Sequence, residues 1–165
     1  VHDDRKHFEY LILDGFQAGL SWQTILNKRG HFRKAFKNFD PVKVSKFTQT
    51  DIERLMNDAG IVRNRLKIEA AISNAKAFLK LREKFGSFDA WIWRFTEGKT
   101  LDGKRKTMKD IPVSSPESDA MSAALRKEGF RFVGSTICYA YMQAAGMVND
   151  HIASCWRKNL NTPAR

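Results

Sequence analysis

Asp14 is the residue whose position first suggests chemistry. It falls near the carboxyl end of an expected first helix, where the helix dipole disfavours an acidic side chain by roughly 0.3–1 kcal/mol. An acid in that place indicates a role beyond the helix, although a plain Asp-Gly turn is the competing interpretation. Gly19 and Leu20 then place a large apolar side chain on a turn. Trp22, at the start of the next helix, is either a core residue or a plate on which a nucleic-acid base can stack.

A second candidate site is the tight apolar turn in residues 128–136, which joins two expected helices. Gly134 is expected to adopt a backbone geometry closed to other residues and to let another chain approach closely. Ser135 and Thr136 then begin a helix, whose free N–H groups and positive dipole end form an anion site. A DNA phosphate would occupy that site without any reading of base sequence. The alternative interpretation is a helix–helix turn with no ligand.

His151 and Cys155 are the candidate metal ligands. Residues four apart lie on one face of a helix, which is suitable spacing for two ligands of a zinc ion. Two ligands make only half of such a site, and spacing alone favours a structural histidine and a buried cysteine. The sequence offers no frame for a Ser/His/Asp triad.

Two further segments are strongly basic. Residues 59–67 form another helical junction with cationic side chains. This junction is either a second contact with the phosphate backbone of nucleic acid or, as we favour, a helix corner whose cations lie in water. Residues 97–110 are polar, glycine-containing and basic, and they predict a long solvated surface loop between two helical groups. Contact of this loop with a phosphate backbone is the less favoured interpretation.

Helices are expected to position all of these residues, because apolar residues recur at helical spacing and no segment alternates as a strand. Cap residues mark the starts, and glycines mark the stops. The expected starts are Asp3 or Asp4, Ser21, Asp40-Pro41, a capping box of Thr50 and Glu53, Ser87, Ser115-Pro116 and Ser135; the expected stops are Gly60, Gly86, Gly129 and Gly146. The sequence therefore predicts an all-α protein.

Composition narrows the class of protein further. The 165 residues are 42% hydrophobic and 28% charged, which suits one globular domain and excludes a disordered tail, a collagen-like repeat or a disulfide scaffold. The net charge of +11 favours a polyanionic partner, either nucleic acid or an anionic membrane face. With two cysteines, Cys138 and Cys155, no signal-peptide pattern and no membrane-spanning run, a cytoplasmic location is expected.

Four motifs, in the same order along the chain, resemble those of the 3-methyladenine DNA glycosylase I family, bacterial alkylation-repair enzymes of the helix-hairpin-helix superfamily. They are residues 13–22 (LDGFQAGLSW), 58–68 (DAGIVRNRLKI), 129–136 (GFRFVGST) and 142–151 (MQAAGMVNDH). The likeness covers nearly the whole chain, and several long motifs in register are far more specific than any one of them. It implies a single domain over residues 1–165, a compact bundle of about eight helices in one or two lobes, with the helix-hairpin-helix motif at about 118–146.

The resemblance implies an activity: hydrolysis of the N-glycosidic bond of 3-methyladenine in duplex DNA, with release of the free base and an abasic site left behind. The damaged nucleotide would be flipped into a pocket. Asp14 would contact the adenine edge and Trp22 would stack on the base. The DNA-binding residues would be Gly19, Leu20, Phe132, Val133, Gly134, Ser135 and Thr136. The family lacks the catalytic aspartate of other helix-hairpin-helix glycosylases, so Asp150 is given no such role. We expect a monomer that binds no membrane.

The sequence also departs from the family. The family usually has Glu where this chain has Asp14, so the shorter carboxylate must act through water or a shifted backbone. Family members also carry a segment before the first helix with a Cys, a His and aromatic residues, and nothing here corresponds to it. That Cys and His would complete a structural zinc site with His151 and Cys155, so zinc is expected for the intact protein and half of its ligands are missing from this chain.

An alternative hypothesis is a non-catalytic DNA-binding module that kept the hairpin but lost the pocket with the amino-terminal segment. A helical protein-interaction domain ranks last, because it leaves the charge and the hairpin unexplained.

Overall fold

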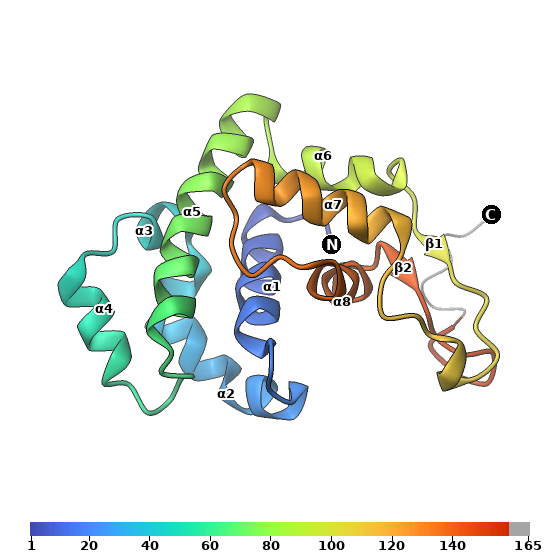
Figure 1. Ribbon diagram of the computed structural model, residues 1–165, viewed down its shortest axis with the longest axis horizontal. Coiled ribbons are helices and arrows are strands. Elements are labelled where there is room, and N and C mark those ends of the chain that lie inside the picture. Colours follow the sequence, from blue (N-terminus) through green and yellow to red (C-terminus); the bar gives the residue numbers. More distant parts are fainter. Residues whose placement is uncertain (159–165) are drawn as a thin grey trace.

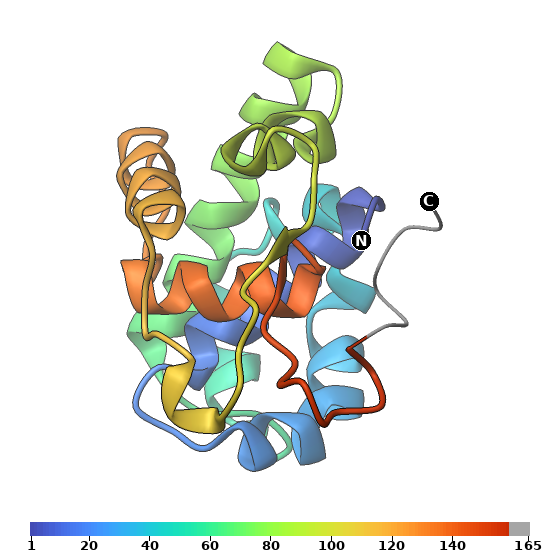
Figure 2. The same ribbon diagram turned by 90° about the vertical axis from the view of Figure 1, so that its right-hand side faces the viewer.

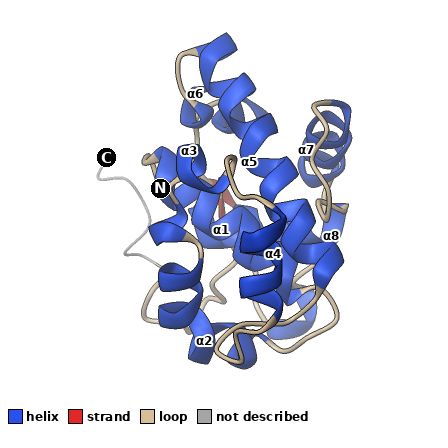
Figure 3. Ribbon diagram, turned by 90° about the vertical axis from the view of Figure 1, so that its left-hand side faces the viewer, coloured by secondary structure: helices blue, strands red, loops and turns tan. Residues whose placement is uncertain are grey.

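The computed structural model describes residues 1–158, and helices make up most of its regular structure (Figures 1 and 3). The α-helices of this described part are α1 (Asp4–Gln17), α2 (Trp22–Ala35), α3 (Pro41–Val44), α4 (Gln49–Met56), α5 (Arg65–Phe85), α6 (Phe88–Ile92), α7 (Pro116–Lys127) and α8 (Ser135–Ala145). Short 3₁₀ helices cover Lys37–Phe39, Trp93–Thr96 and Met108–Asp110, and two short strands, β1 (Leu101–Asp102) and β2 (Val148–Asn149), pair in parallel. The predicted all-α class is confirmed, with this small strand pair as an addition.

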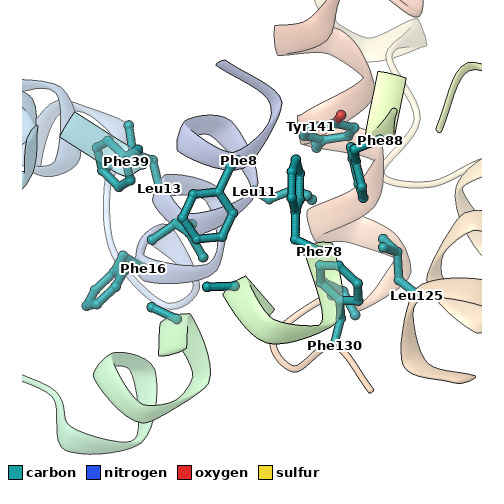
Figure 4. Close-up of a cluster of buried hydrophobic side chains, with 14 of the residues drawn as sticks. Phe8, Leu11, Leu13, Phe16, Phe39, Phe78, Phe88, Leu125, Phe130 and Tyr141 are labelled. Carbon is teal, nitrogen blue, oxygen red and sulfur yellow. The ribbon is translucent and has the colours of Figure 1, made fainter. Parts of the chain in front are cut away.

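Helix α1 lies in the middle of the fold and contacts α2, α5, α6 and α8 (Figure 1). Apolar residues at helical spacing cover more than one of its sides, so it is buried among its neighbours. The ring of Phe8 meets Phe78 of α5 edge-on at 5.3 Å between centroids, and Phe16 meets Phe32 of α2 at 4.9 Å. Figure 4 shows Phe8, Phe16 and Phe78 within the buried apolar cluster. Because α1 is packed on several sides, it gives Asp14 in its last turn a rigid support.

Side-chain caps confirm most of the predicted helix starts. The cap residues that accept a hydrogen bond from a backbone amide of the first turn are Asp3, Ser21, Asp40, Ser87 and Ser115. Each cap side chain accepts a hydrogen bond from a first-turn N–H that has no partner within the helix, and this fixes the residue at which the helix begins. Gly86 ends α5 with φ +82°, in the left-handed conformation that suits glycine.

The predicted boundaries of α4 are wrong by a few residues. The capping box is formed by Thr48 and Asp51 rather than by Thr50 and Glu53, and Thr48 N–H donates to Asp51 Oδ2 at 3.0 Å. The helix ends at Met56, before Gly60 is reached. Two candidate pairs with the same three-residue spacing overlap here, and spacing alone could not choose between them.

The predicted solvated loop over residues 97–110 is wrong in part, because the chain is held there at two points. β1 of this segment pairs with β2 beyond α8. Arg105 Nε donates to Asp150 Oδ1 at 2.8 Å, and a Cβ at Gly103 would collide with the same carboxylate oxygen. The segment is therefore anchored to the carboxyl-terminal part of the fold.

Helices α7 and α8 pack against each other and are joined by a short hairpin, so the predicted helix-hairpin-helix is present (Figure 2). Helix α8 ends at Gly146, which has φ +79°. None of the helices in residues 1–158 combines the length and apolar character needed to cross a membrane.

Candidate functional site

The side chain of Asp14 is buried without a partner. It lies in the last turn of α1, is 1% exposed, and neither carboxylate oxygen has a hydrogen-bond partner within the described residues. Burial raises the pKa of this carboxyl group well above its ordinary value of 3.8. An unpaired buried carboxylate is costly, and groups of this kind are concentrated at functional sites.

A cavity of about 160 Å³ opens at Asp14. An engineered apolar cavity of about 150 Å³ holds one benzene ring, so this one has room for an aromatic ring with the rest of a larger base toward its mouth. Trp22, 38% exposed at the first turn of α2, lies in its wall. The full lining is Tyr10, Leu13, Asp14, Trp22, Leu26, Arg29 and Ala144, from α1, α2 and α8. The structure thus brings the two predicted base-contacting residues to one cavity.

The cavity wall also carries a cation, Arg29, that is paired with a buried acid. Arg29 Nε donates to Glu9 Oε1 at 2.7 Å, and Arg33 Nε donates to the same oxygen at 2.9 Å. Glu9 is buried at 6% exposure, so its charge is poorly screened by water. The Glu9 carboxylate is shared by Arg29 and Arg33 and offsets part of their charge, whereas Asp14, the acidic residue of the cavity lining, has no cationic partner among the described residues.

Side chains of α5 and α7 hold the backbone of the hairpin between α7 and α8 through hydrogen bonds. Asn74 of α5 is buried and bonds both backbone groups of Arg131: Arg131 N–H donates to Asn74 Oδ1 at 2.8 Å, and Asn74 Nδ2 donates to Arg131 O at 2.9 Å. Ser122 Oγ donates to Val133 O at 2.6 Å. Between these bonds Phe132 has φ +56°, a left-handed conformation that costs a non-glycine residue energy and persists only when its surroundings fix it.

A run of backbone amides in the hairpin has no hydrogen-bond acceptor among the described residues. Within residues 1–158, the consecutive N–H groups from Phe132 to Ile137 donate to no protein acceptor. They include the first turn of α8, where the helix dipole adds positive potential. Phe132, Val133, Gly134, Ser135 and Thr136 therefore present the row of donors that the sequence predicted for a phosphate.

The prediction about Gly134 is half wrong. Its φ of −61° is open to other residues, and the left-handed conformations of the hairpin belong to Gly129 and Phe132 instead. The space in front of Gly134 is open, because a Cβ there would meet only Arg126 Nη2 at 3.7 Å. Close approach of a ligand, rather than backbone freedom, therefore stays the prediction for Gly134.

The turn that links Asp14 to Trp22 exposes an apolar side chain. Gly19 has φ +78°, and Leu20 is 38% exposed. Leu20 N–H donates to Gln17 O at 2.7 Å, and Gln17 Nε2 donates to Leu20 O at 2.6 Å, so the turn is closed by two bonds. The expectation that the cations of residues 59–67 lie in water is wrong for Lys67, which is 9% exposed and bonded to α1.

Asp150, to which the sequence assigned no catalytic role, is fully engaged. Its carboxylate accepts from Arg105 Nε, Tyr139 Oη and Gln143 Nε2. Burial acts to raise its pKa, but these hydrogen bonds outweigh burial and the pKa is lowered. Through these bonds the group holds residues 101–105 against α8.

His151 and Cys155 lie together, although not on a helix as their spacing suggested. The segment forms turns, and the distance from Cys155 Sγ to His151 Nδ1 is 3.5 Å. Tetrahedral zinc with bonds of about 2.3 Å to sulfur and 2.0 Å to nitrogen separates two such ligands by about 3.5 Å. The pair therefore fits half of a zinc site, and no third His, Cys, Asp or Glu joins it within residues 1–158.

Four residues of the site were missed at the sequence level. Tyr10 and Arg29 line the cavity, and Asn74 and Lys67 support the hairpin and the turn. Helical periodicity could have placed Tyr10 on the same face as Asp14, four residues later. Nothing local could have revealed the partners of Asn74 and Lys67, which lie about fifty residues away along the chain.

A hairpin between two packed helices, next to a buried acid at a ring-sized cavity, places the protein in the helix-hairpin-helix class of all-α folds. More specifically, the chain belongs to the methyladenine glycosylase family, whose family model matches residues 1–158. It is 48% identical over 153 residues to DNA-3-methyladenine glycosylase 1 of Escherichia coli (strain K12), covering 93% of this chain and 82% of that protein.

Solved structures agree with this assignment. A crystal structure of 3-methyladenine DNA glycosylase I superposes with a TM-score of 0.92 at 47% identity, covering 94% of this chain and 86% of the other. The 3-methyladenine DNA glycosylase I of Staphylococcus aureus, described for its recognition of 3-methyladenine, superposes with a TM-score of 0.93 at 34% identity, covering 96% and 84%.

Proposed function

We propose that this chain is a DNA glycosylase of base-excision repair that hydrolyses the N-glycosidic bond of 3-methyladenine in alkylated duplex DNA, releasing the base and leaving an abasic site. Its family and relatives support this function. One observation carries it for this chain: the carboxylate of Asp14 is buried without a partner, in the wall of a ring-sized cavity that it shares with Trp22.

The substrate suits these residues. Methylation at N3 makes the adenine of the nucleotide cationic, so the base is already a good leaving group and needs little acid catalysis. Asp14 would attract this cation and accept hydrogen bonds from the adenine edge. Trp22 would stack on the base, with a cation–π contribution of about 2 kcal/mol once water is excluded. Asp14 and Trp22 thus favour the cationic ring over a neutral one.

Access to the glycosidic bond requires the nucleotide to leave the helix. The free amides of the hairpin would hold backbone phosphates without reading sequence. Leu20, exposed on its closed turn, would fill the space that the flipped base vacates, which offsets part of the unstacking cost. The net charge of +11 adds attraction to the duplex that weakens with salt.

We also propose a structural zinc ion in the intact protein, held by His151 and Cys155 and by two ligands from outside the residues that the structure describes. The sulfur-to-nitrogen distance of 3.5 Å supports this assignment. Zinc here would tie segments of chain together and take no part in hydrolysis. We further propose a monomer in the cytoplasm, since the residues that line the cavity all come from one chain and the free cysteines Cys138 and Cys155 suit a reducing compartment.

The test compares base release with DNA binding. The wild-type chain should release 3-methyladenine from methylated duplex DNA, and Asp14→Ala should lose most of that release while its affinity for undamaged duplex persists. A matched control is Glu83→Ala, which removes an exposed carboxylate outside the cavity. If the wild-type chain binds duplex but releases no base, the alternative of a non-catalytic DNA-binding module replaces this proposal.

A further inference from the structure

Lys67 occupies a position that is unfavourable for a cation on two counts. It lies in the first turn of α5, where the helix dipole disfavours positive charge, and its side chain is buried at 9% exposure. Burial lowers its pKa, and no carboxylate pairs with it within the described residues. A lysine kept there indicates that its ammonium group has a specific task.

The ammonium group of Lys67 is bonded to the carboxyl end of α1. Nζ donates to Phe16 O at 2.9 Å and to Ala18 O at 2.6 Å. The last turn of α1 contains no basic residue of its own, so Lys67 supplies from another helix the cation that a helix end favours. The negative end of α1 and the buried ammonium thus satisfy each other.

These two bonds fix the base of the turn that carries Leu20. Ala18 is the residue after α1, Gly19 follows in a left-handed conformation, and Leu20 is tied back to Gln17. With Ala18 O held by Lys67 and Leu20 held by Gln17, the turn has anchors at both of its ends. The exposed leucine is therefore presented on a rigid support rather than on a loose loop.

Lys67 also stands next to the hairpin. Its Nζ lies 5.9 Å from the centre of the Phe132 ring, and Phe132 packs against α1 at Gly15, where a Cβ would lie 3.5 Å from Phe132 Cβ. Two turns further along α5, on the same side, Asn74 is hydrogen-bonded to Arg131. The turn and the hairpin, more than a hundred residues apart in sequence, thus meet on one face of α5.

We propose that Lys67 is a positioning residue that holds the Gly19–Leu20 turn at a fixed place relative to the hairpin, so that Leu20 enters the duplex where the damaged nucleotide leaves it. This inference rests on the proposed function. Lys67 touches neither base nor reacting atoms, and it acts through Leu20.

The test is a double-mutant cycle of Lys67→Met and Leu20→Ala, measured as kcat/KM for base release from methylated duplex DNA. Methionine keeps the length of the side chain and removes the donor. Lys67→Met alone should reduce kcat/KM about tenfold, which corresponds to one net hydrogen bond to a charged group. In the Leu20→Ala background the same substitution should cost less than about twofold, because the residue through which it acts is already gone.

Two further measurements separate positioning from other roles. Binding of free 3-methyladenine should be unchanged in Lys67→Met, since the cavity remains intact. Arg65→Met, which removes an exposed cation from the same helical turn, should have little effect and controls for lost charge. Should Lys67→Met not fold, Lys67→Gln, which replaces the ammonium by a shorter, uncharged amide, takes its place in the cycle.

The inference is overturned if the losses of the two single variants multiply in the double variant, or if free-base binding weakens as much as duplex activity. In the second case Lys67 shapes the cavity rather than the turn. A wild-type chain that releases no base would refute the proposed function itself, which keeps the two failures distinct.

Discussion

Replacing Asp14 by Asn should make the protein more stable while it loses activity. The substitution preserves shape and removes a carboxylate that is 1% exposed and has no hydrogen-bond partner in the described residues. A buried unsatisfied polar group costs about 1–3 kcal/mol, and more when it is charged. Because the amide of Asn would also lack partners, we expect a net gain of about 1–2 kcal/mol in the free energy of unfolding at neutral pH. For a chain of this size the melting temperature should rise by roughly 2–8 °C.

The gain should depend on pH in a defined direction. Because the pKa of Asp14 is raised in the folded state, the folded protein keeps a proton that the unfolded chain loses above about pH 3.8. Wild-type stability therefore falls as pH rises from that value through the folded-state pKa. The difference between Asp14→Asn and wild type should be close to zero near pH 4, grow through this window and then level off. Base release should fall at least tenfold in the variant, since the charge that attracts the cationic base is gone.

Urea denaturation at a series of pH values measures this difference, with Asp150→Asn as a control of opposite sign. Asp150 is hydrogen-bonded by Arg105, Tyr139 and Gln143, and its pKa is lowered, so its contribution to stability is present at neutral pH and lost as pH falls through its folded-state pKa. Asp150→Asn should therefore destabilise the protein at pH 7. If Asp14→Asn also destabilises it, or if its effect does not vary with pH, the carboxylate is not an unpaired charge and the reasoning fails.

Three other perturbations test the rest of the site. Glu9→Gln removes the carboxylate that pairs with Arg29 beside the cavity, so kcat/KM for the cationic substrate should fall about tenfold. The affinity for free, neutral 3-methyladenine should change little. Equal losses in both quantities would indicate a collapsed cavity. Gly134→Val should weaken binding to every duplex sequence by about tenfold, as measured by fluorescence anisotropy, and intact affinity would refute the phosphate-binding hairpin. Metal analysis of the intact protein should find about one zinc ion per chain, lost in Cys155→Ser; a folded, metal-free protein would leave His151 and Cys155 as ordinary structural residues.

The elements whose signals are local could be predicted from the sequence. Caps such as Asp3, Ser21 and Ser115 act on amides within three residues, so their spacing is visible in the chain itself. Asp14 was found by the same kind of argument, since an acid at the wrong end of a helix is a local conflict. The overlapping box at Thr48 shows the limit, because two local patterns of equal quality compete there.

What could not be predicted depends on contacts between distant segments. The left-handed residue of the hairpin is Phe132 rather than Gly134, because Asn74 and Ser122 fix the backbone on either side of it from other helices. Lys67 was assigned to solvent because its partners are carbonyls of α1, which carry no side-chain signal. Backbone acceptors supplied by another element leave no trace in sequence spacing.

The central claim is that Asp14 and the cavity beside it receive the methylated base, and one titration tests it most directly. Free 3-methyladenine is added to protein with ¹³C-labelled aspartate carboxyl groups and ¹⁵N-labelled tryptophan indoles, followed by NMR. The account predicts that the Asp14 carboxyl signal and the Trp22 indole signal shift together and saturate at one base per chain, while the Asp150 signal stays in place. Saturable binding that leaves Asp14 and Trp22 unchanged would contradict the account.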